Sequence, residues 1–414
     1  MGRCTRSMSE AGAALLMAAL LGSGARAAST TQVIYSFAGD EDGEYTDTEL
    51  AIDGAGNLYG TSVQGGDFSS GTVFQLAPSG SSWVHTVLYS FEGEADGGEP
   101  YKGVTLDAEG NLYGTAGVGG LYVGPCIDTG CGVVYKLTNS GGTWTQTVIH
   151  SFTGGHDGFG PGAGVTVDRH GNILGMTPTG GAYGFGIVYQ LHPNGDGTYT
   201  ERVIHTFTGG ADGLGGSPGR LAVDAAGNVF GLSTAGGANG NGDVFELSPT
   251  QTGEWNVTVL YAFLGEPGSG FPYGALVADA QGNLYGTTYY AGANDLGTVY
   301  RLSRRNGVWR ETGIYSFQGG RDGAGPLSTL VAAADGNLYG TTSEGGAGCN
   351  CGTIFKLTLT DSGVTYGVAH RFKGPPDGAY VYNGMVADST GTNLYGATVH
   401  GGVSGEGAIY RFTP

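Results

Sequence analysis

Gly56-Asn57-Leu58-Tyr59-Gly60-Thr61 is the stretch that decides the fold, because close copies of it recur along the whole chain. The other six copies begin at Asn111, Asn172, Asn228, Asn283, Asn337 and Asn393. Successive asparagines are separated by 54, 61, 56, 55, 54 and 56 residues. A near-constant period of this length indicates one repeat architecture that occupies almost the entire chain, and not a series of unrelated domains.

Each repeat divides into four short apolar segments that are separated by glycine-rich turns. In the first repeat we expect strands over residues 50–53, 58–61, 71–76 and 83–91. Apolar side chains occur on both faces of these segments, as expected if every sheet packs between two others. Four antiparallel strands in about 55 residues are typical of a β-propeller blade.

The two ends of the chain carry incomplete repeats that complement each other. Residues 33–37 (Val-Ile-Tyr-Ser-Phe) match the fourth strand of the first repeat, whereas the last repeat stops after its third strand at residues 410–412. Pairing the two would remove an open sheet edge that otherwise promotes aggregation. We therefore predict an all-β fold, a seven-bladed β-propeller of four-stranded antiparallel blades, closed by the N-terminal strand completing the last blade.

The amino terminus has the pattern of a secretory signal. Arg3 and Arg6 precede an apolar run over residues 11–21, and Ala25-Arg26-Ala27 follows as a small-x-small cleavage pattern. We predict a signal peptide over residues 1–27 and a single propeller domain over 28–414. The apolar run is too short to remain as a membrane anchor, so we expect no membrane span in the mature protein. Removing the signal changes the formal net charge from −19 to about −21, which argues against a nucleic-acid partner.

Four cysteines remain after this cleavage, and they form two local pairs. Cys126 and Cys131 enclose four residues and can close with ordinary disulfide geometry, whereas Cys349 and Cys351 enclose one and close only with strain. Disulfides would suit an oxidising compartment. The competing hypothesis is a four-cysteine zinc site, which the unusual spacings and the separation into the second and sixth repeats disfavour.

The repeat motifs also resemble a known family. Repeats with Gly-Asn-Leu-Tyr-Gly-Thr, then Gly-Gly, Gly-Thr-Val-Phe-x-Leu and Tyr-Ser-Phe-x-Gly resemble the GloVer-type tandem-repeat proteins of bacteria, over residues 31–414. The resemblance implies an exported propeller-like protein, often fused to a carboxy-terminal surface anchor, with no general activity established. Because Pro414 follows the last expected strand directly, we expect a soluble secreted or periplasmic protein.

One series of candidate residues is a ring of carboxylates on the face that carries the loops between blades. They belong to Gly-x-x-Asp-Gly segments at Asp42, Asp96, Asp157, Asp212, Asp322 and Asp377. The simpler interpretation is a tight turn, in which the aspartate accepts local backbone hydrogen bonds. The alternative is binding of Ca²⁺ or a polyhydroxylated ligand, with Asp40, Asp42 and Asp96 as weak metal candidates, although calcium needs about six to eight oxygen ligands.

Residues that differ between repeats are better candidates for a ligand surface, because aromatic rings beside amides and carboxylates suit sugars or peptides. We assign Tyr101, Tyr183, Tyr273, Tyr289 and Tyr290 to loops of this face. The ligand-binding candidates are Asp96, Tyr101, His156, Asp157, Tyr183, Arg220, Tyr289, Tyr290 and Asp295. Ser217 matches a serine-elbow pattern, which chance explains better in so glycine-rich a chain.

The sequence favours an exported, non-catalytic and monomeric propeller that binds a glycan or an envelope protein through its loop-rich face. No repeat contains an evident nucleophile or acid/base set. One alternative is a polysaccharide hydrolase or lyase in which Asp157 and Glu344 act as acid and base, and another is a purely structural envelope protein. A deep axial pocket with two convergent carboxylates would favour the enzyme, and a filled channel would favour binding.

Overall fold

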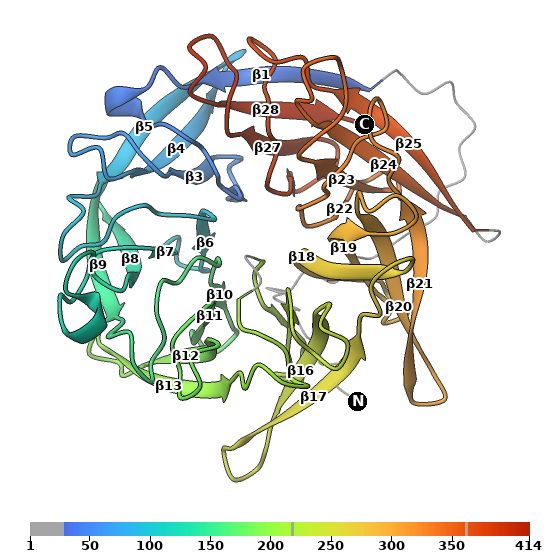
Figure 1. Ribbon diagram of the computed structural model, residues 1–414. Helices are drawn as coiled ribbons and strands as arrows, with labels where there is room; N and C mark the ends of the chain where they lie inside the picture. The colour runs from blue at the N-terminus through green and yellow to red at the C-terminus, as the bar shows by residue number, and fades with distance from the viewer. Residues whose placement is uncertain (1–28, 217–218, 361–362) are drawn as a thin grey trace, which may run out of the picture.

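The fold is a ring of seven four-stranded sheets around a central axis, as predicted (Figure 1). The computed structural model describes residues 29–216, 219–360 and 363–414. The predicted signal peptide over residues 1–27 and the serine-elbow residue Ser217 therefore lie outside the described residues.

The first four blades follow the chain in order. Blade 1 comprises β2 (Ala51–Ile52), β3 (Leu58–Ser62), β4 (Thr72–Ser79) and β5 (Ser82–Ser90). Blade 2 comprises β6 (Val104–Leu106), β7 (Leu112–Ala116), β8 (Val133–Ser140) and β9 (Thr143–Ser151). Blade 3 comprises β10 (Thr166–Val167), β11 (Ile173–Thr177), β12 (Ile187–Pro193) and β13 (Tyr199–Thr206). Blade 4 comprises β14 (Ala222–Val223), β15 (Val229–Ser233), β16 (Asp243–Pro249) and β17 (Trp255–Ala262).

The remaining blades and two short 3-10 helices complete the ring. Blade 5 comprises β18 (Ser269–Ala278), β19 (Leu284–Ala291), β20 (Thr298–Arg305) and β21 (Val308–Ser316). Blade 6 comprises β22 (Val331–Ala332), β23 (Leu338–Thr342), β24 (Thr353–Thr360) and β25 (Gly363–Arg371). Blade 7 comprises β26 (Val386–Ala387), β27 (Leu394–Thr398), β28 (Ala408–Thr413) and β1 (Thr30–Ser36). The helices η1 (Asp40–Asp42) and η2 (Gly124–Cys126) lie in loops of blades 1 and 2.

The ring closes through the two ends of the chain. Strand β1 pairs antiparallel with β28, from Thr30 opposite Thr413 to Ser36 opposite Ala408. The two strands lie side by side in Figure 1 although they come from opposite ends of the chain. The predicted closure by the N-terminal strand is therefore confirmed, and it gives β28 a partner along its outer edge.

Blade 5 differs from the prediction in its first hairpin. The equivalent strands elsewhere have two or three residues, whereas β18 extends over ten and pairs with a lengthened β19, with Gly270 opposite Tyr290 and Tyr273 opposite Thr287. Tyr273, Tyr289 and Tyr290 thus belong to strands, and their assignment to loops was wrong. The physical reason is that β18 and β19 form additional backbone hydrogen bonds, which extend this hairpin to the loop-rich face. The three tyrosines therefore lie on hydrogen-bonded strands.

The hydrophobic core is divided among the interfaces between blades. One cluster joins Val73 and Phe91 of blade 1 to Leu112 and Tyr135 of blade 2, and all four are fully buried. The last glycine of the repeated motif allows this packing, because an aromatic ring of the third strand lies across it. A Cβ atom on Gly114 would stand 2.3 Å from the hydroxyl of Tyr135. The motif therefore builds blades, and does not form seven binding sites.

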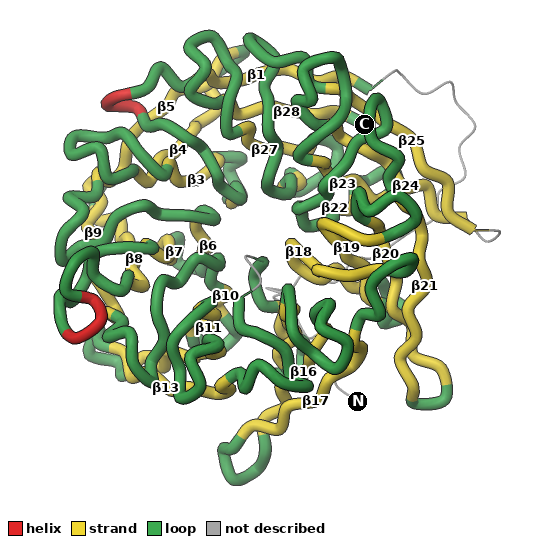
Figure 2. Tube along the Cα trace, viewed as in Figure 1, coloured by secondary structure: helices red, strands yellow, loops and turns green. Residues whose placement is uncertain are grey.

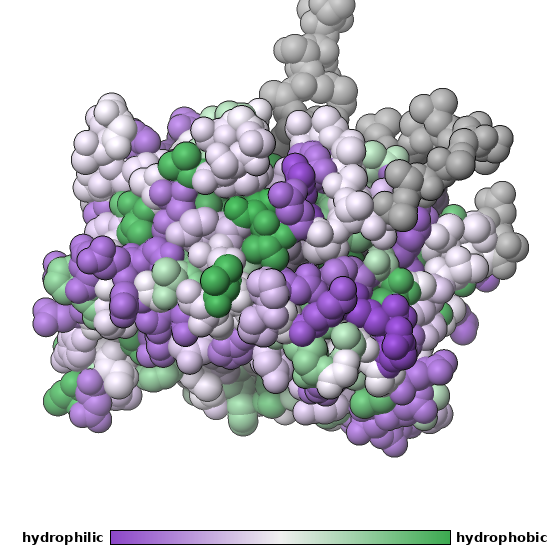
Figure 3. Space-filling model, turned by 90° about the horizontal axis from the view of Figure 1, so that it is seen from above, coloured by the Kyte–Doolittle hydropathy of each residue, from purple (hydrophilic) through white to green (hydrophobic). Residues whose placement is uncertain are grey.

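Both predicted disulfides are present, Cys126 with Cys131 and Cys349 with Cys351. Figure 2 shows the long loops spread over one face of the ring, where both 3-10 helices also lie. The side of the ring in Figure 3 is mostly hydrophilic or neutral, with hydrophobic groups in small separate patches. None of the helices in the described ranges is long and apolar enough to cross a lipid bilayer.

Candidate functional site

The ring of Asp-Gly segments is a repeated structural turn. In blade 1, Asp96 accepts the backbone N–H of Glu92 at 2.8 Å and the hydroxyl of Tyr89 at 2.9 Å. Every other aspartate of the ring also accepts a backbone N–H from the residue four positions before it, namely Asp42, Asp157, Asp212, Asp322 and Asp377. The turn interpretation accounts for these hydrogen bonds, and the carboxylates hold the loops that join neighbouring blades.

The three metal candidates chosen from the sequence lie in two different loops. Asp42 accepts the Tyr35 hydroxyl at 2.7 Å and the backbone N–H of Ala38, so its two oxygens serve its own turn. Asp96 lies in the loop after blade 1, and Asp40 is exposed at the start of η1. Neither Asp40, Asp42 nor Asp96 belongs to the cluster of potential metal ligands found in the described part of the chain.

An ion pair spans the centre of the ring. Arg220 enters from blade 4, and its Nε atom lies 3.0 Å from Glu49 Oε2 of blade 1. The same guanidinium donates to the hydroxyl of Thr105 and, at 2.9 Å, to the carbonyl of Val104 in blade 2. Thr329 of blade 6 donates to Glu49 Oε1 at 3.3 Å. Arg220, which the sequence suggested as a ligand-binding residue, thus links blades across the channel.

A second polar group lies at the same mouth of the channel. Lys102 Nζ lies 3.1 Å from Asp47 Oδ1 and donates to Asn383 Oδ1 at 3.0 Å. The Asn383 amide also donates to Asp47 at 2.5 Å, which joins blades 7, 1 and 2. Together the two groups place charged and amide side chains across the centre of the ring.

Aromatic side chains form an arc beside this polar centre, on blade 5, on blade 7 and in the loops that precede blades 7 and 1. We define the tyrosine arc as Tyr45, Phe271, Tyr273, Tyr289, Tyr290, Tyr380, Tyr382 and His400. Ring centroids are 4.3 Å apart for Tyr289 and Tyr290, and 5.6 Å apart for Tyr380 and His400. Tyr290 is 47% exposed and Tyr380 36% exposed, so the arc presents open ring surface to solvent.

Carboxylates connect the two halves of the arc. Glu344 lies close enough to influence Tyr289 on one side and Tyr382 on the other. Burial raises the pKa of Tyr289, with further repulsion from Tyr290 and Glu344. Burial also raises the pKa of Tyr382, and Asp47 of the central polar group adds to that effect. These hydroxyls therefore stay protonated at neutral pH and can donate hydrogen bonds.

The other sequence candidates are distributed around the ring. Tyr101 lies at the mouth and donates to Glu99 at 3.0 Å, and burial raises its pKa to about 12. Asp295 accepts the backbone N–H of Ala291 at 2.8 Å, which makes it a turn residue. Tyr183 is 62% exposed on a blade 3 loop, and His156 is exposed beside Asp157. Only Tyr289 and Tyr290 of the original candidates belong to the arc.

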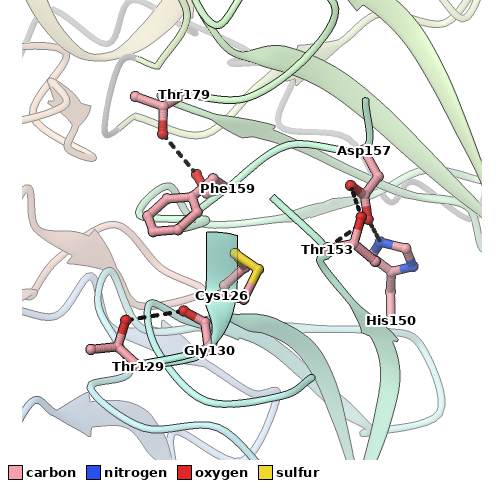
Figure 4. Close-up of a disulfide and its surroundings, with 9 residues drawn as sticks. Cys126, Thr129, Gly130, His150, Thr153, Asp157, Phe159 and Thr179 are labelled. Carbon is pink, nitrogen blue, oxygen red and sulfur yellow. Dashed lines mark hydrogen bonds and ion pairs between the residues drawn. A yellow bond between two sulfur atoms is a disulfide. The ribbon is translucent and has the colours of Figure 1, made fainter. Parts of the chain in front are cut away.

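Asp157 belongs to a cluster between blades 2 and 3. Its Oδ2 atom lies 3.9 Å from His150 Nε2, which also lies 3.9 Å from Glu201 Oε2 (Figure 4 shows His150 and Asp157). Burial, with repulsion from Asp157, raises the pKa of Glu201 to about 7. Burial lowers the pKa of His150. The acid/base partner suggested for Asp157 was Glu344, but Glu344 lies on blade 6, near Tyr289 of the tyrosine arc.

Several residues at these sites were not identified from the sequence. Asp47, Glu49, Lys102 and Asn383 lie in segments without a repeated motif, and their partners are in distant repeats. Glu201 occupies a strand position at which the residue type varies from blade to blade. The sequence could have indicated these residues only through a comparison of the repeats. A residue that differs from those at the equivalent positions of the other repeats indicates a role in its own blade.

Solved structures support the same fold at low sequence identity. The putative 6-phosphogluconolactonase of Bacteroides uniformis is 13% identical with a TM-score of 0.54, and the match covers 83% of this chain and 88% of that one. A hypothetical selenium-binding protein of Sulfolobus tokodaii is 10% identical with a TM-score of 0.52 and 76% of each chain covered. No curated protein sequence matches the chain. These similarities concern the fold alone.

A sequence family identifies the repeat itself. The Gloeobacter/Verrucomicrobia repeat matches residues 126–319 and, in a second overlapping match, residues 254–414. These ranges include the blades that carry most of the tyrosine arc and the whole carboxy-terminal half of the ring. The chain belongs to the Gloeobacter/Verrucomicrobia repeat family.

Proposed function

We propose that this protein is an exported, non-catalytic binding propeller whose tyrosine arc holds a glycan. The observation that carries the proposal is the run of accessible aromatic rings from Phe271 to Tyr45 at the mouth of the channel. Flat aromatic faces pack against the apolar faces of sugar rings, and neighbouring polar groups bind their hydroxyls.

The polar groups beside the arc support a polyhydroxylated ligand. Glu344 and Asp47 offer carboxylate oxygens as acceptors, while the tyrosine hydroxyls offer donors. Tyr289 packs over Gly325, where a Cβ would stand 2.8 Å from its ring, so this ring is held in place before a ligand arrives. A preorganised aromatic surface loses little side-chain entropy on binding.

Two features favour binding over hydrolysis. Arg220 and Glu49 bridge the channel, where an axial active-site pocket would otherwise lie. The suggested acid/base pair is divided, with Asp157 held by Thr153 in the loop after blade 2 while Glu344 of blade 6 lies near Tyr289. Glycosidases need two carboxyl groups within about 10 Å across one bond.

Export to the periplasm or the exterior fits the two disulfides. Cys126–Cys131 and Cys349–Cys351 each close a short loop. Disulfides persist in oxidising compartments and are rare in the bacterial cytosol.

The test is a screen of soluble glycans by affinity electrophoresis, followed by titration calorimetry on any that retard the protein. We expect Tyr290→Ala and Tyr380→Ala to weaken binding by about tenfold or more, as loss of a stacking ring costs about 1–3 kcal/mol. Tyr183→Ala is the control, because Tyr183 is even more exposed than Tyr290 and Tyr380 but lies on blade 3 outside the arc. Equal losses in the control, or no retarded glycan, would refute the proposal.

A further inference from the structure

We propose that His150, Asp157 and Glu201 form a zinc-binding site between blades 2 and 3. His150 lies on β9, Asp157 in the loop that leaves β9, and Glu201 on β13 of the next blade. One donor atom from each side chain lies within 4.8 Å of the other two. The site is separate from the tyrosine arc and from the bridged channel.

The spacing of these atoms fits a shared cation better than direct contacts. His150 Nε2 stands 3.9 Å from both carboxylates, which is beyond hydrogen-bond range. Ligands at about 2.0–2.2 Å from tetrahedral zinc stand roughly 3.4 Å apart, so small side-chain rotations bring this set into range. Three protein ligands would leave one position for water or another ligand.

Two donor atoms of the cluster have no other partner among the described residues. Both His150 Nε2 and Glu201 Oε1 are shielded from solvent and make no hydrogen bond there. A buried polar atom without a partner costs about 1–3 kcal/mol. A bound cation would satisfy the imidazole and the carboxylate together, while the 15–18% exposure of the side chains leaves a route for entry.

The other blades act as internal comparisons, because the same strand and loop positions recur. In three blades the strand residue is a tyrosine that bonds the loop aspartate directly, as Tyr89 does with Asp96 at 2.9 Å. The position of Glu201 is occupied elsewhere by His85, Gln146, Val257, Glu311, Tyr366 and Thr31. Across the described ranges, only His150, Asp157 and Glu201 bring the donor atoms of a histidine and two carboxylates within 4.8 Å of one another.

The Cys126–Cys131 disulfide stabilises the loop that carries Asp157. A Cβ on Gly154 would stand 2.7 Å from the sulfur of Cys131, so this loop packs directly against the bridge. Figure 4 shows Cys126 close to the segment that joins Thr153 and Asp157. Thr153 further holds the carboxylate through its hydroxyl at 2.6 Å and its N–H at 2.8 Å. Such support orients a metal ligand before the ion binds.

The chemical types of the three ligand atoms indicate which metal ion would bind. One imidazole nitrogen with two carboxylates suits zinc and similar first-row divalent cations. Calcium takes about six to eight oxygen ligands, and this cluster offers an imidazole and only two carboxylates. We therefore expect Zn²⁺ to bind in the presence of millimolar Ca²⁺.

The test is calorimetric titration of the chelator-treated mature protein with ZnCl₂. We expect one zinc per chain, with affinity reduced at least about tenfold in His150→Ala and in the isosteric Glu201→Gln. The matched control is His370→Ala in blade 6, where His370 lies 3.1 Å from Asp377 without a second carboxylate. This control should bind zinc like the unmodified protein.

Zinc K-edge absorption distinguishes this site from a cysteine site, because our site contains nitrogen and oxygen ligands and no sulfur. Melting temperatures without metal verify that each variant folds. The inference is overturned if the protein takes up no zinc, if both variants retain full affinity, or if sulfur is found in the coordination shell.

Discussion

At the residue scale, the repeated motif is explained by close packing between one glycine and one ring. The ring is tyrosine in four blades and phenylalanine in the other three, and a Cβ on Gly396 would stand 2.4 Å from the Tyr410 hydroxyl. Among the described residues, that hydroxyl is buried without a hydrogen-bond partner. The ring is therefore required at this position, and the hydroxyl is not.

We predict that Tyr410→Phe leaves stability unchanged or raises it by about 1 kcal/mol, because it removes an unsatisfied buried hydroxyl. Gly396→Ala should cost about 1–3 kcal/mol through overpacking against the same ring. Urea denaturation of the two variants checks both values. A marked loss in Tyr410→Phe would mean that the hydroxyl has a stabilising partner.

Asp243 is a second residue that can be understood by comparing equivalent positions in different blades. It is fully buried, and neither carboxylate oxygen has a hydrogen-bond partner among the described residues. Burial, with repulsion from Asp212, raises its pKa to about 7, and Asp212 in turn lies 3.3 Å from His205. The equivalent residue of blade 1 is Thr72, whose hydroxyl bonds Ser62 at 2.8 Å.

We predict that Asp243→Thr stabilises the protein at neutral pH, because Ser233 would gain a hydroxyl partner and a buried charge would be removed. Since the folded-state pKa is raised from 3.8 to about 7, the favourable contribution of protonated Asp243 is complete below about pH 4 and is lost as the pH rises through 7. The gain in the variant should therefore grow from pH 4 to pH 8, up to about 4 kcal/mol. Thermal unfolding across this range measures it, and a gain independent of pH would exclude the charge as its cause.

At the scale of elements, β1 is the strand on which the closure of the ring depends. It supplies the outer edge of blade 7, and Phe37, immediately after it, is fully buried in the cluster between blades 7 and 1. Without β1, the backbone groups of β28 would form an open edge.

We predict that deleting residues 29–37 lowers the melting temperature sharply and causes aggregation, because both the strand pairing and the Phe37 packing are lost. Differential scanning calorimetry and light scattering measure the two effects. Replacing Thr30 and Gln32, two exposed residues of β1, with alanine is the control and should change little. Unfolding that is unaffected by the deletion would contradict a closing role for β1.

At the scale of the whole molecule, repetition and variation have separate roles. The positions that repeat build turns, strands and interfaces between blades, as Asp96 and Leu112 do. Side chains that vary between the repeats meet in three places: the bridged channel, the tyrosine arc and the cluster of His150. Function is therefore expected where the repeats differ.

The sequence by itself determined the number of blades, their four strands, the closing strand and both disulfide pairs, because these depend on periodicity and on neighbours close in the chain. Only the tertiary structure showed which varied side chains meet. Arg220 reaches Glu49, and Asn383 reaches Asp47, across gaps of 171 and 336 residues. Such contacts form only after the ring has closed and each blade has taken its orientation around the axis. No pattern of residues close in sequence determines that orientation.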